Sequence, residues 1–245
     1  MTKVALATPN PERAFYSGFT VFMALVVFAG FARTYYLRPL LPAPALAGQL
    51  PVTGLIHVHA LLFSGWMVLL VLQARLVATG RVPLHRRLGL AGVALAVLMV
   101  GVGTVTALQA VGRGVSPPGL DARRFLVVPL FALLVFGVLF AAAVVARRRP
   151  QAHKRLMLLA TIGLLPPALA RWLIFYLGLG PPVVLGVTTL FVVPLVVWDL
   201  STRGRLHPAT LWGGLFVVLS VPARLAIAFT PGWLGLADRL TSLVR

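Results

Sequence analysis

The sequence has no cysteine and very few acidic residues. The absence of cysteine among its 245 residues excludes disulfide bonds, thiolate-bound metal ions, a cysteine nucleophile and iron–sulfur clusters. Only four residues are Asp or Glu, against 22 Lys or Arg, which gives a formal net charge of +18. Charged residues make up 11% of the chain, whereas a soluble domain carries about 25%. This composition argues against an ordinary soluble domain.

What the sequence has instead is apolar runs. Hydrophobic residues make up 60% of the chain, and they recur in runs of roughly 20, the length of a helix that spans the hydrocarbon core of a bilayer. The pattern predicts an all-α membrane protein with a single transmembrane domain, residues 1–245, of about seven helices. The predicted spans are residues 14–32, 53–73, 88–111, 125–146, 156–177, 183–198 and 210–229.

Basic residues lie mainly in the connections between the runs. The most basic connection is "RRRPQAHKR", residues 147–155. Because cytoplasmic loops are enriched in Lys and Arg, this distribution predicts an inside N-terminus and an outside C-terminus. A soluble basic domain that could contact phosphates is missing, so nucleic acid is not an expected partner.

Three connections and the runs that follow them resemble one another. "GRVPLHRRLGLAG", "RRPQAHKRLMLLA" and "GRLHPATLWGG" each place a histidine after basic residues and before an apolar run. This pattern predicts a two-helix hairpin repeated three times behind an extra first helix. Internal repeats are common in membrane transport folds.

Several cationic or titratable residues lie inside the runs or at the end of one, where an ionisable side chain is costly and is a functional candidate by default. By their positions they share one layer near the outer side, and no carboxylate in that layer neutralises them. Since Arg suits carboxylate and phosphate groups, the layer predicts a pocket for an anionic ligand or cofactor. The alternative is that the long Arg side chains extend to the interface. These residues are Arg33, at the outer end of the first run, and His57, His59, Arg171 and Arg224.

The two histidines of "HVHALLFSGW" are not equivalent. Two residues on a helix correspond to about 200°, so His57 and His59 point to opposite faces. His59 shares its face with Trp66 and Gln73, and this polar stripe is expected to face protein. Two roles stay open for His59: a histidine hydrogen-bonded to a neighbouring helix, or a ligand of haem b or a metal ion. A haem would need a second ligand such as Met or water, because no other run has a histidine at that depth.

The inner ends of the runs carry further candidates. His85, His153 and His207 each precede a run. They could bind a metal ion if the helix ends converge, or they could anchor the helices against anionic lipid. The first carboxylate inside a run is Asp199, at an inner end, so no carboxylate proton relay is expected within the membrane.

The segments "FARTYYLRPL", "HVHALLFSGW", "LHRRLG", "HKRLMLLATI" and "GRLHPATLWGG" together resemble a family of bacterial seven-helix integral membrane proteins of unassigned activity. The resemblance covers nearly the whole chain. It implies a multi-pass protein of the bacterial inner membrane. It implies no particular reaction or ligand.

The favoured hypothesis is an accessory, non-catalytic membrane protein with an outer pocket of His and Arg residues. The ligand would be a lipid headgroup, a small carboxylate or the propionates of a haem. The proposed binding residues are His59, Arg171, Arg224, His57, Arg33, Trp66 and Gln73. The alternatives are a redox protein that uses haem b or a quinone, a small-molecule transporter, and a structural subunit of a larger membrane complex.

Overall fold

The computed structural model describes residues 10–42, 44, 52–117 and 120–243. All regular elements among these residues are helices. The elements in chain order are α1 (Pro11–Phe31), the π-helix η1 (Ala32–Tyr36), α3 (Gly54–Ala78), α4 (Val82–Gly112), α5 (Ala122–Phe125), α6 (Val127–Val145), the 3-10 helix η2 (Ala146–Arg148), α7 (Pro150–Ile162), α8 (Pro166–Leu173), α9 (Pro181–Leu190), α10 (Val193–Arg203), α11 (Pro208–Ile227) and α12 (Pro231–Ser242).

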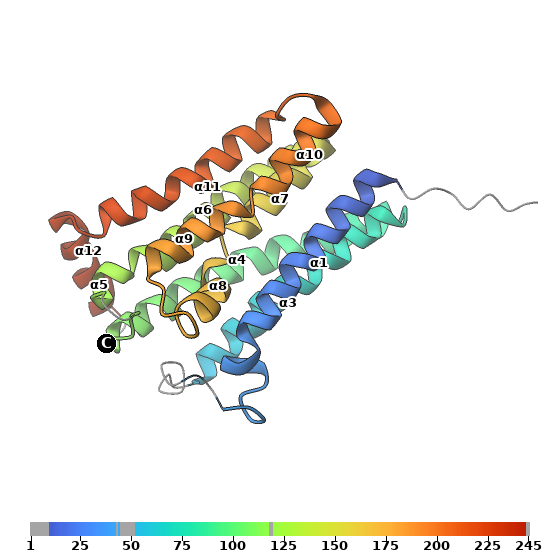
Figure 1. Cartoon of the computed structure of the whole chain (residues 1–245). Helices are drawn as coiled ribbons and strands as arrows, with labels where there is room; N and C mark the ends of the chain where they lie inside the picture. The colour runs from blue at the N-terminus through green and yellow to red at the C-terminus, as the bar shows by residue number, and fades with distance from the viewer. Residues whose placement is uncertain (1–9, 43, 45–51, 118–119, 244–245) are drawn as a thin grey trace, which may run out of the picture.

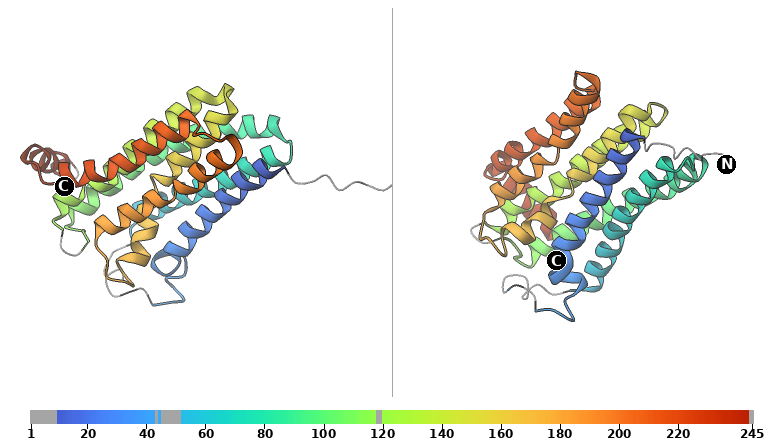
Figure 2. Two further views of the ribbon diagram at one scale, coloured as in Figure 1. Left: turned by 45° about the horizontal axis from the view of Figure 1, so that its top comes forward. Right: turned by 45° about the vertical axis from the view of Figure 1, so that its right-hand side comes forward.

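The long helices form one bundle whose axes run in roughly the same direction (Figure 1). Helices α1 and α3 lie on one side and α11 lies on the other, with α4, α6 and α7 between them (Figures 1 and 2). The closest packing is between α3 and α4, α6 and α7, and α1 and α3. We call the end that holds the start of α1 and the end of α10 the basic end. The other end, which holds η1 and α12, is called the opposite end.

Local sequence explains where several helices begin. The Asn10 side chain accepts hydrogen bonds from the backbone N–H groups of Glu12 and Arg13, at 3.0 and 3.3 Å, which caps α1. The Thr53 hydroxyl accepts from the N–H of Ile56 at the start of α3. Many of the other helices have proline in their first turn, where a missing N–H costs nothing. Side-chain caps satisfy the first N–H groups, which have no partner inside the helix.

Six helices are long and apolar enough to cross a membrane, and a seventh is counted if the bent pair α7 and α8 is one span. This confirms the predicted class, an all-α protein with several membrane-spanning helices, in the part of the chain that the structure describes. Each predicted span overlaps one of these helices or helix pairs. The predicted orientation stays a prediction.

The fifth predicted span, residues 156–177, is bent rather than continuous. Helices α7 and α8 meet at an angle of 41° across Gly163, Leu164 and Leu165. Pro166 and Pro167 follow, and neither has an N–H to donate to the preceding turn, which disfavours a continuous helix at this point. The predicted span of residues 156–177 therefore consists of two helices separated by a break.

The tail after the last predicted span also forms a helix that the sequence analysis did not predict. Trp233 of α12 donates from Nε1 to the carbonyl oxygen of Arg123 at 3.0 Å, and Arg123 contacts Asp238 of α12 at 3.3 Å. These contacts hold α12 against the start of α5 at the opposite end.

Helices α1 and α8 approach each other closely. A side-chain carbon added to Gly30 of α1 would lie 2.7 Å from the backbone oxygen of Ala168 in α8. Only glycine permits this approach, since the obstructing atom is backbone and cannot rotate away. The contact brings the end of α1 against α8, which carries Arg171.

Candidate functional site

Arg171 joins α8 to the end of α1 through uncharged partners. Its Nε donates to the hydroxyl of Thr34 at 2.9 Å, and one terminal nitrogen donates to the carbonyl oxygen of Pro167 at 2.6 Å. The guanidinium carbon lies 3.8 Å from the centre of the Phe31 ring, a cation–π contact. Arg171 is therefore held in place by groups that carry no charge.

The π-helix η1 supplies most of the neighbouring polar groups. The hydroxyl of Tyr35 lies 2.8 Å from Nδ1 of His57, and the hydroxyl of Tyr36 lies 2.5 Å from the hydroxyl of Ser64. The wider π turn thus connects the end of α1 to the first turns of α3. Single π turns occur often at functional sites. We call this region, formed by η1, the start of α3 and α8, the η1 cluster.

Arg33 also belongs to the η1 cluster. Its terminal nitrogen donates to the carbonyl oxygen of Pro42 at 2.9 Å, and its guanidinium carbon lies 5.7 Å from the centre of the Tyr176 ring. Its Nε is buried and has no hydrogen-bond partner among the described residues. Like Arg171, it is positioned by neutral groups.

The two histidines occupy different surroundings, as the helical spacing predicts. His57 is exposed and contacts Tyr35, whereas His59 is partly buried and stacks on Phe63 with ring centres 4.1 Å apart. Nδ1 of His59 is buried and makes no hydrogen bond within the described chain. His59 lies close enough to Arg171 for the two to interact electrostatically. The structure therefore brings His57, His59, Arg33 and Arg171 to one region.

Trp66 and Gln73 lie further along α3. By helical rise they are roughly 10 and 21 Å from His59. Trp66 is buried, and its Nε1 donates to the hydroxyl of Thr161 in α7 at 3.2 Å. The side-chain oxygen of Gln73 is buried without a partner among the described residues. The stripe does face protein, as expected, but these two residues lie outside the η1 cluster.

Arg224 is not brought together with His59 and Arg171. It lies on α11, on the other side of the bundle from α3 (Figures 1 and 2), and is 2% exposed. One terminal nitrogen donates to the hydroxyl of Ser220 at 3.1 Å, and Nε has no partner in the described structure. Helical depth alone placed it beside the others, and depth does not specify the position around the bundle.

The four acidic residues of the chain are all described, and each contacts a cation away from the η1 cluster. Asp121 and Asp238 contact Arg123 near α12, while the other two lie at the basic end and contact Lys154 and Arg155. Backbone N–H groups of Arg124 and Arg123 hold the pKa of the Asp121 carboxyl below its usual range. The η1 cluster is therefore a set of cations without a carboxylate partner in the described chain.

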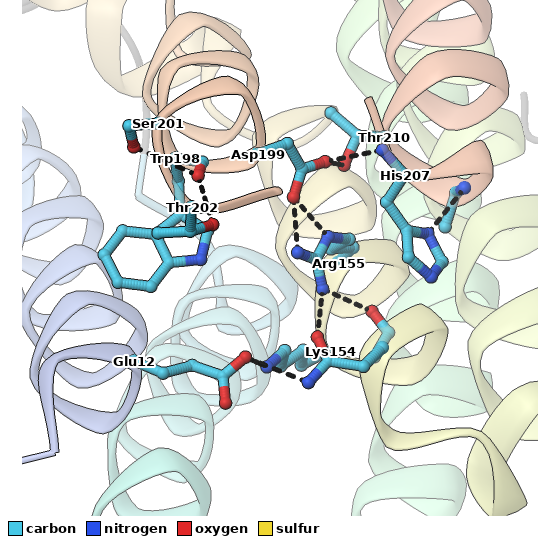
Figure 3. Close-up of polar contacts among 11 residues, drawn as sticks. Glu12, Lys154, Arg155, Trp198, Asp199, Ser201, Thr202, His207 and Thr210 are labelled. Atoms are coloured by element: carbon cyan, nitrogen blue, oxygen red, sulfur yellow. Dashed lines mark hydrogen bonds and ion pairs between the residues drawn. The ribbon is translucent and has the colours of Figure 1, made fainter. Parts of the chain in front are cut away.

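A buried polar network that was not predicted from the sequence lies at the basic end (Figure 3). Asp199 of α10 accepts from the Nε of Arg155 in α7 at 3.0 Å and also contacts a terminal nitrogen of the same guanidinium. Its second oxygen accepts from the hydroxyl of Thr210 at 2.6 Å and from the N–H of His207 at 3.0 Å. Four polar groups from α7, α10 and α11 thus satisfy one another.

The network extends from Arg155 to α1. A terminal nitrogen of Arg155 donates to the side-chain oxygen of Gln151 at 2.6 Å. Gln151 in turn donates to Glu12 at 3.0 Å, and Lys154 forms an ion pair with the same Glu12 oxygen. The signal in the sequence that could have indicated this network is the small number of acidic residues. Two of only four carboxylates lie at the end where the most basic loop begins a helix, which favours pairing.

The three inner histidines do not form a metal site. His85 and His153 have ring centres 6.3 Å apart, whereas His207 caps α11 by accepting from the N–H of Ala209 at 3.0 Å. In the described part of the chain, no group of three or more His, Cys, Asp or Glu residues could hold a metal ion. Burial, together with the nearby charge of Arg155, lowers the pKa of His207.

No protein-family model, curated protein or solved structure matches the chain.

Proposed function

We propose that the chain is a multi-pass membrane protein that binds an anionic ligand at the η1 cluster. The observation that carries this proposal is the set of positioned cations whose partners are neutral: Arg171 on Thr34, Pro167 and Phe31, and Arg33 on Pro42 and Tyr176. A charge at a membrane-spanning helix is costly unless it is paired. A bound anion supplies the pairing that the protein's own carboxylates do not.

Each residue has a distinct role in this proposal. Arg171 and Arg33 neutralise the anion and donate hydrogen bonds, since guanidinium groups match the geometry of carboxylate and phosphate. The start of α3 adds favourable partial charge, because the N-terminus of a helix attracts anions. Tyr35, His57 and His59 add polar contacts around it. The ligand class is therefore a phosphate or carboxylate group, either from an anionic lipid or from a small acid.

The experiment is a ligand-induced change in melting temperature of the protein purified in a neutral detergent. Phosphatidylglycerol is compared with phosphatidylcholine, which has no net charge. We expect phosphatidylglycerol to raise the melting temperature of the wild type and of Arg75→Gln, an exposed arginine on the other end of α3. The rise is expected to disappear in Arg171→Gln. Equal stabilisation of all three proteins would contradict the proposal.

Haem binding is a narrower form of the same proposal. Nδ1 of His59 is buried without a partner in the described structure, and Arg33 and Arg171 carry charges suited to propionates. An absorption spectrum of the purified protein tests it, since a haem protein shows a Soret band that His59→Ala would remove or shift. Absence of that band leaves the lipid or small acid as the ligand.

A transport function is the second candidate, and the break between α7 and α8 favours it. Transporters often place discontinuous helices at their binding sites, and α8 carries Arg171 directly after such a break. Uptake of labelled small acids into proteoliposomes tests this role. Flux equal to that of empty liposomes, with binding intact, would assign the site to binding alone. We further propose the inner membrane of a bacterium as its location, which fractionation of expressing cells tests.

A further inference from the structure

A cavity of about 390 Å³ lies at the basic end, away from the η1 cluster. Its lining comes from the start of α1, the start of α7 and the end of α10. Binding pockets for small molecules occupy roughly 300–1,000 Å³, so the cavity has room for a small ligand. No role proposed above uses it.

The walls of the cavity are fixed by the buried polar network. Arg155 lines the cavity and bonds to Gln151 and Asp199, while Gln151 bonds to Glu12 of α1. Arg155 is 1% exposed, so its position is set by these bonds rather than by solvent. Three segments distant in the sequence are therefore held around one cavity before any ligand arrives (Figure 3).

Two oppositely charged side chains at the cavity, Glu12 and Arg203, can each form further hydrogen bonds. In Glu12, one carboxylate oxygen, Oε1, accepts from both Gln151 and Lys154. The other oxygen, Oε2, has no partner among the described residues. Arg203 is exposed and lines the same cavity, and its guanidinium makes neither a hydrogen bond nor an ion pair within the described chain. The cavity thus offers one free acceptor with negative charge and one free donor with positive charge.

The lining also includes an aromatic ring, that of Trp198. Trp198 stacks on Phe15 with ring centres 4.4 Å apart and planes 9° from parallel. Figure 3 shows Trp198 and Glu12 on the same side of Arg155, and both line the cavity. The stacked ring supplies a rigid apolar wall against which a short carbon chain can pack.

We propose that this cavity binds a small zwitterion, with its ammonium group on Oε2 of Glu12 and its acid group on Arg203. The carbons that separate the two charges pack against Trp198. A ligand with only one charge satisfies only one of the two free groups. The shared chemistry is an ammonium group a few bonds from a phosphate or carboxylate, and it occurs in the headgroup of an aminophospholipid and in soluble amino acids and their phosphate analogues.

The experiment measures binding to the full-length protein carrying Arg171→Gln, because anion binding at the η1 cluster requires Arg171 in the function proposed above. Short-chain phosphatidylethanolamine, free phosphoethanolamine and glycine are the zwitterionic probes. Phosphatidylglycerol, which lacks the ammonium group, is the matched probe. We expect at least one zwitterion to raise the melting temperature, and we expect phosphatidylglycerol to leave it unchanged. Stabilisation by phosphatidylethanolamine alone identifies a headgroup site, and stabilisation by the free compounds identifies a soluble ligand.

Two further variants in the same background test the assigned residues. Glu12→Gln keeps an oxygen that accepts from Gln151 and Lys154 but removes the negative charge, and Arg203→Gln removes the positive charge. Each is expected to weaken binding by about tenfold or more, the size of one hydrogen bond to a charged group. Arg205→Gln, an exposed arginine outside the lining, is expected to bind as the parent does.

Three results would overturn the proposal. They are equal stabilisation by phosphatidylglycerol and phosphatidylethanolamine, no stabilisation by any zwitterion, and unchanged binding by Glu12→Gln and Arg203→Gln. Because the parent already lacks Arg171, each of these results leaves the anion site at the η1 cluster to be judged by its own experiment.

Discussion

At the basic end, Arg155 is 1% exposed and lies against the fully buried carboxylate of Asp199, whereas at the opposite end Arg171 lies against a hydroxyl, a carbonyl oxygen and an aromatic ring. Both arginines are positioned by neighbouring helices. They differ in the source of the negative charge. At the basic end the protein supplies it, and at the opposite end, in our proposal, a ligand supplies it. A chain with four acidic residues can neutralise few of its cations internally. We therefore infer that arginines paired with these carboxylates stabilise the fold, whereas buried arginines with only neutral partners are available to bind an anion.

The largest effect is expected from breaking the pair at the basic end. Asp199→Ala leaves Arg155 buried without its carboxylate and removes the acceptor of Thr210 and His207. Loss of one partner of a buried ion pair costs about 3–5 kcal/mol, so melting temperature and yield in detergent should fall sharply.

A matched control is the exposed pair at the opposite end. Asp238→Ala removes the contact with Arg123, in which both side chains are about half exposed, and exposed pairs contribute about 0–1 kcal/mol. Melting temperatures that fall equally for the two alanine variants would contradict the structural role assigned to Asp199.

The next effect concerns the close approach that builds the η1 cluster. Gly30→Ala places a carbon 2.7 Å from the backbone of Ala168, which forces α1 and α8 apart at a cost of about 1–3 kcal/mol. Because Thr34 and Arg171 lie one turn beyond this contact, anion binding should weaken as well. Gly18→Ala is the control on the same helix, since nothing lies within 4 Å of its added carbon. Similar melting curves for both variants would disprove the close approach.

A smaller effect is expected from a hydrogen bond in the middle of the bundle, between the basic end and the opposite end. Trp66→Phe keeps the buried ring but removes the hydrogen bond from Nε1 to Thr161, which contributes about 1 kcal/mol. Chemical unfolding in mixed micelles measures the difference, and Thr161→Val should show nearly the same loss. The double variant should lose little more than either one, whereas additive losses would argue against the bond.

The smallest effect is a pH dependence at the basic end. The Nδ1 of His207 caps α11 only when unprotonated, and burial lowers the pKa of this group from 6.5. Its contribution is therefore fully present above pH 6.5 and is lost as the pH falls toward the lower pKa of the folded state. His207→Asn keeps a capping side chain that does not titrate. The melting temperature of the variant should fall less than that of the wild type between pH 7.5 and 5, and parallel pH profiles would contradict the assignment.

The sequence predicted most of the fold because the relevant signals are local. Runs of apolar residues of the length of the bilayer predict spanning helices whatever their neighbours are. The break between α7 and α8 was not predicted, since the apolar run over residues 156–177 predicts one span. Helix α12 was missed because its twelve residues are mixed in polarity and depend on contacts with Arg123.

The site was predicted less completely because depth and angular position are different quantities. Helical rise placed Arg171 and Arg224 at similar depth, but the packing order of the helices puts one beside α1 and the other on α11. Periodicity did predict that His57 and His59 face different surroundings, since both lie on one helix. The pair of Arg155 and Asp199 joins residues 44 positions apart, and no local pattern indicates such a contact.

A carboxylate introduced beside Arg171 tests most directly whether this arginine binds an external anion. Thr34→Glu places a carboxylate beside Arg171, whose Nε already donates to the Thr34 hydroxyl at 2.9 Å. Thr34→Gln is the neutral control of equal size. The measurement is the dissociation constant for phosphatidylglycerol in detergent. We expect Thr34→Glu to fold normally and to lose binding, and we expect Thr34→Gln to retain it. Equal affinity of the two variants for phosphatidylglycerol would show that Arg171 does not bind an external anion.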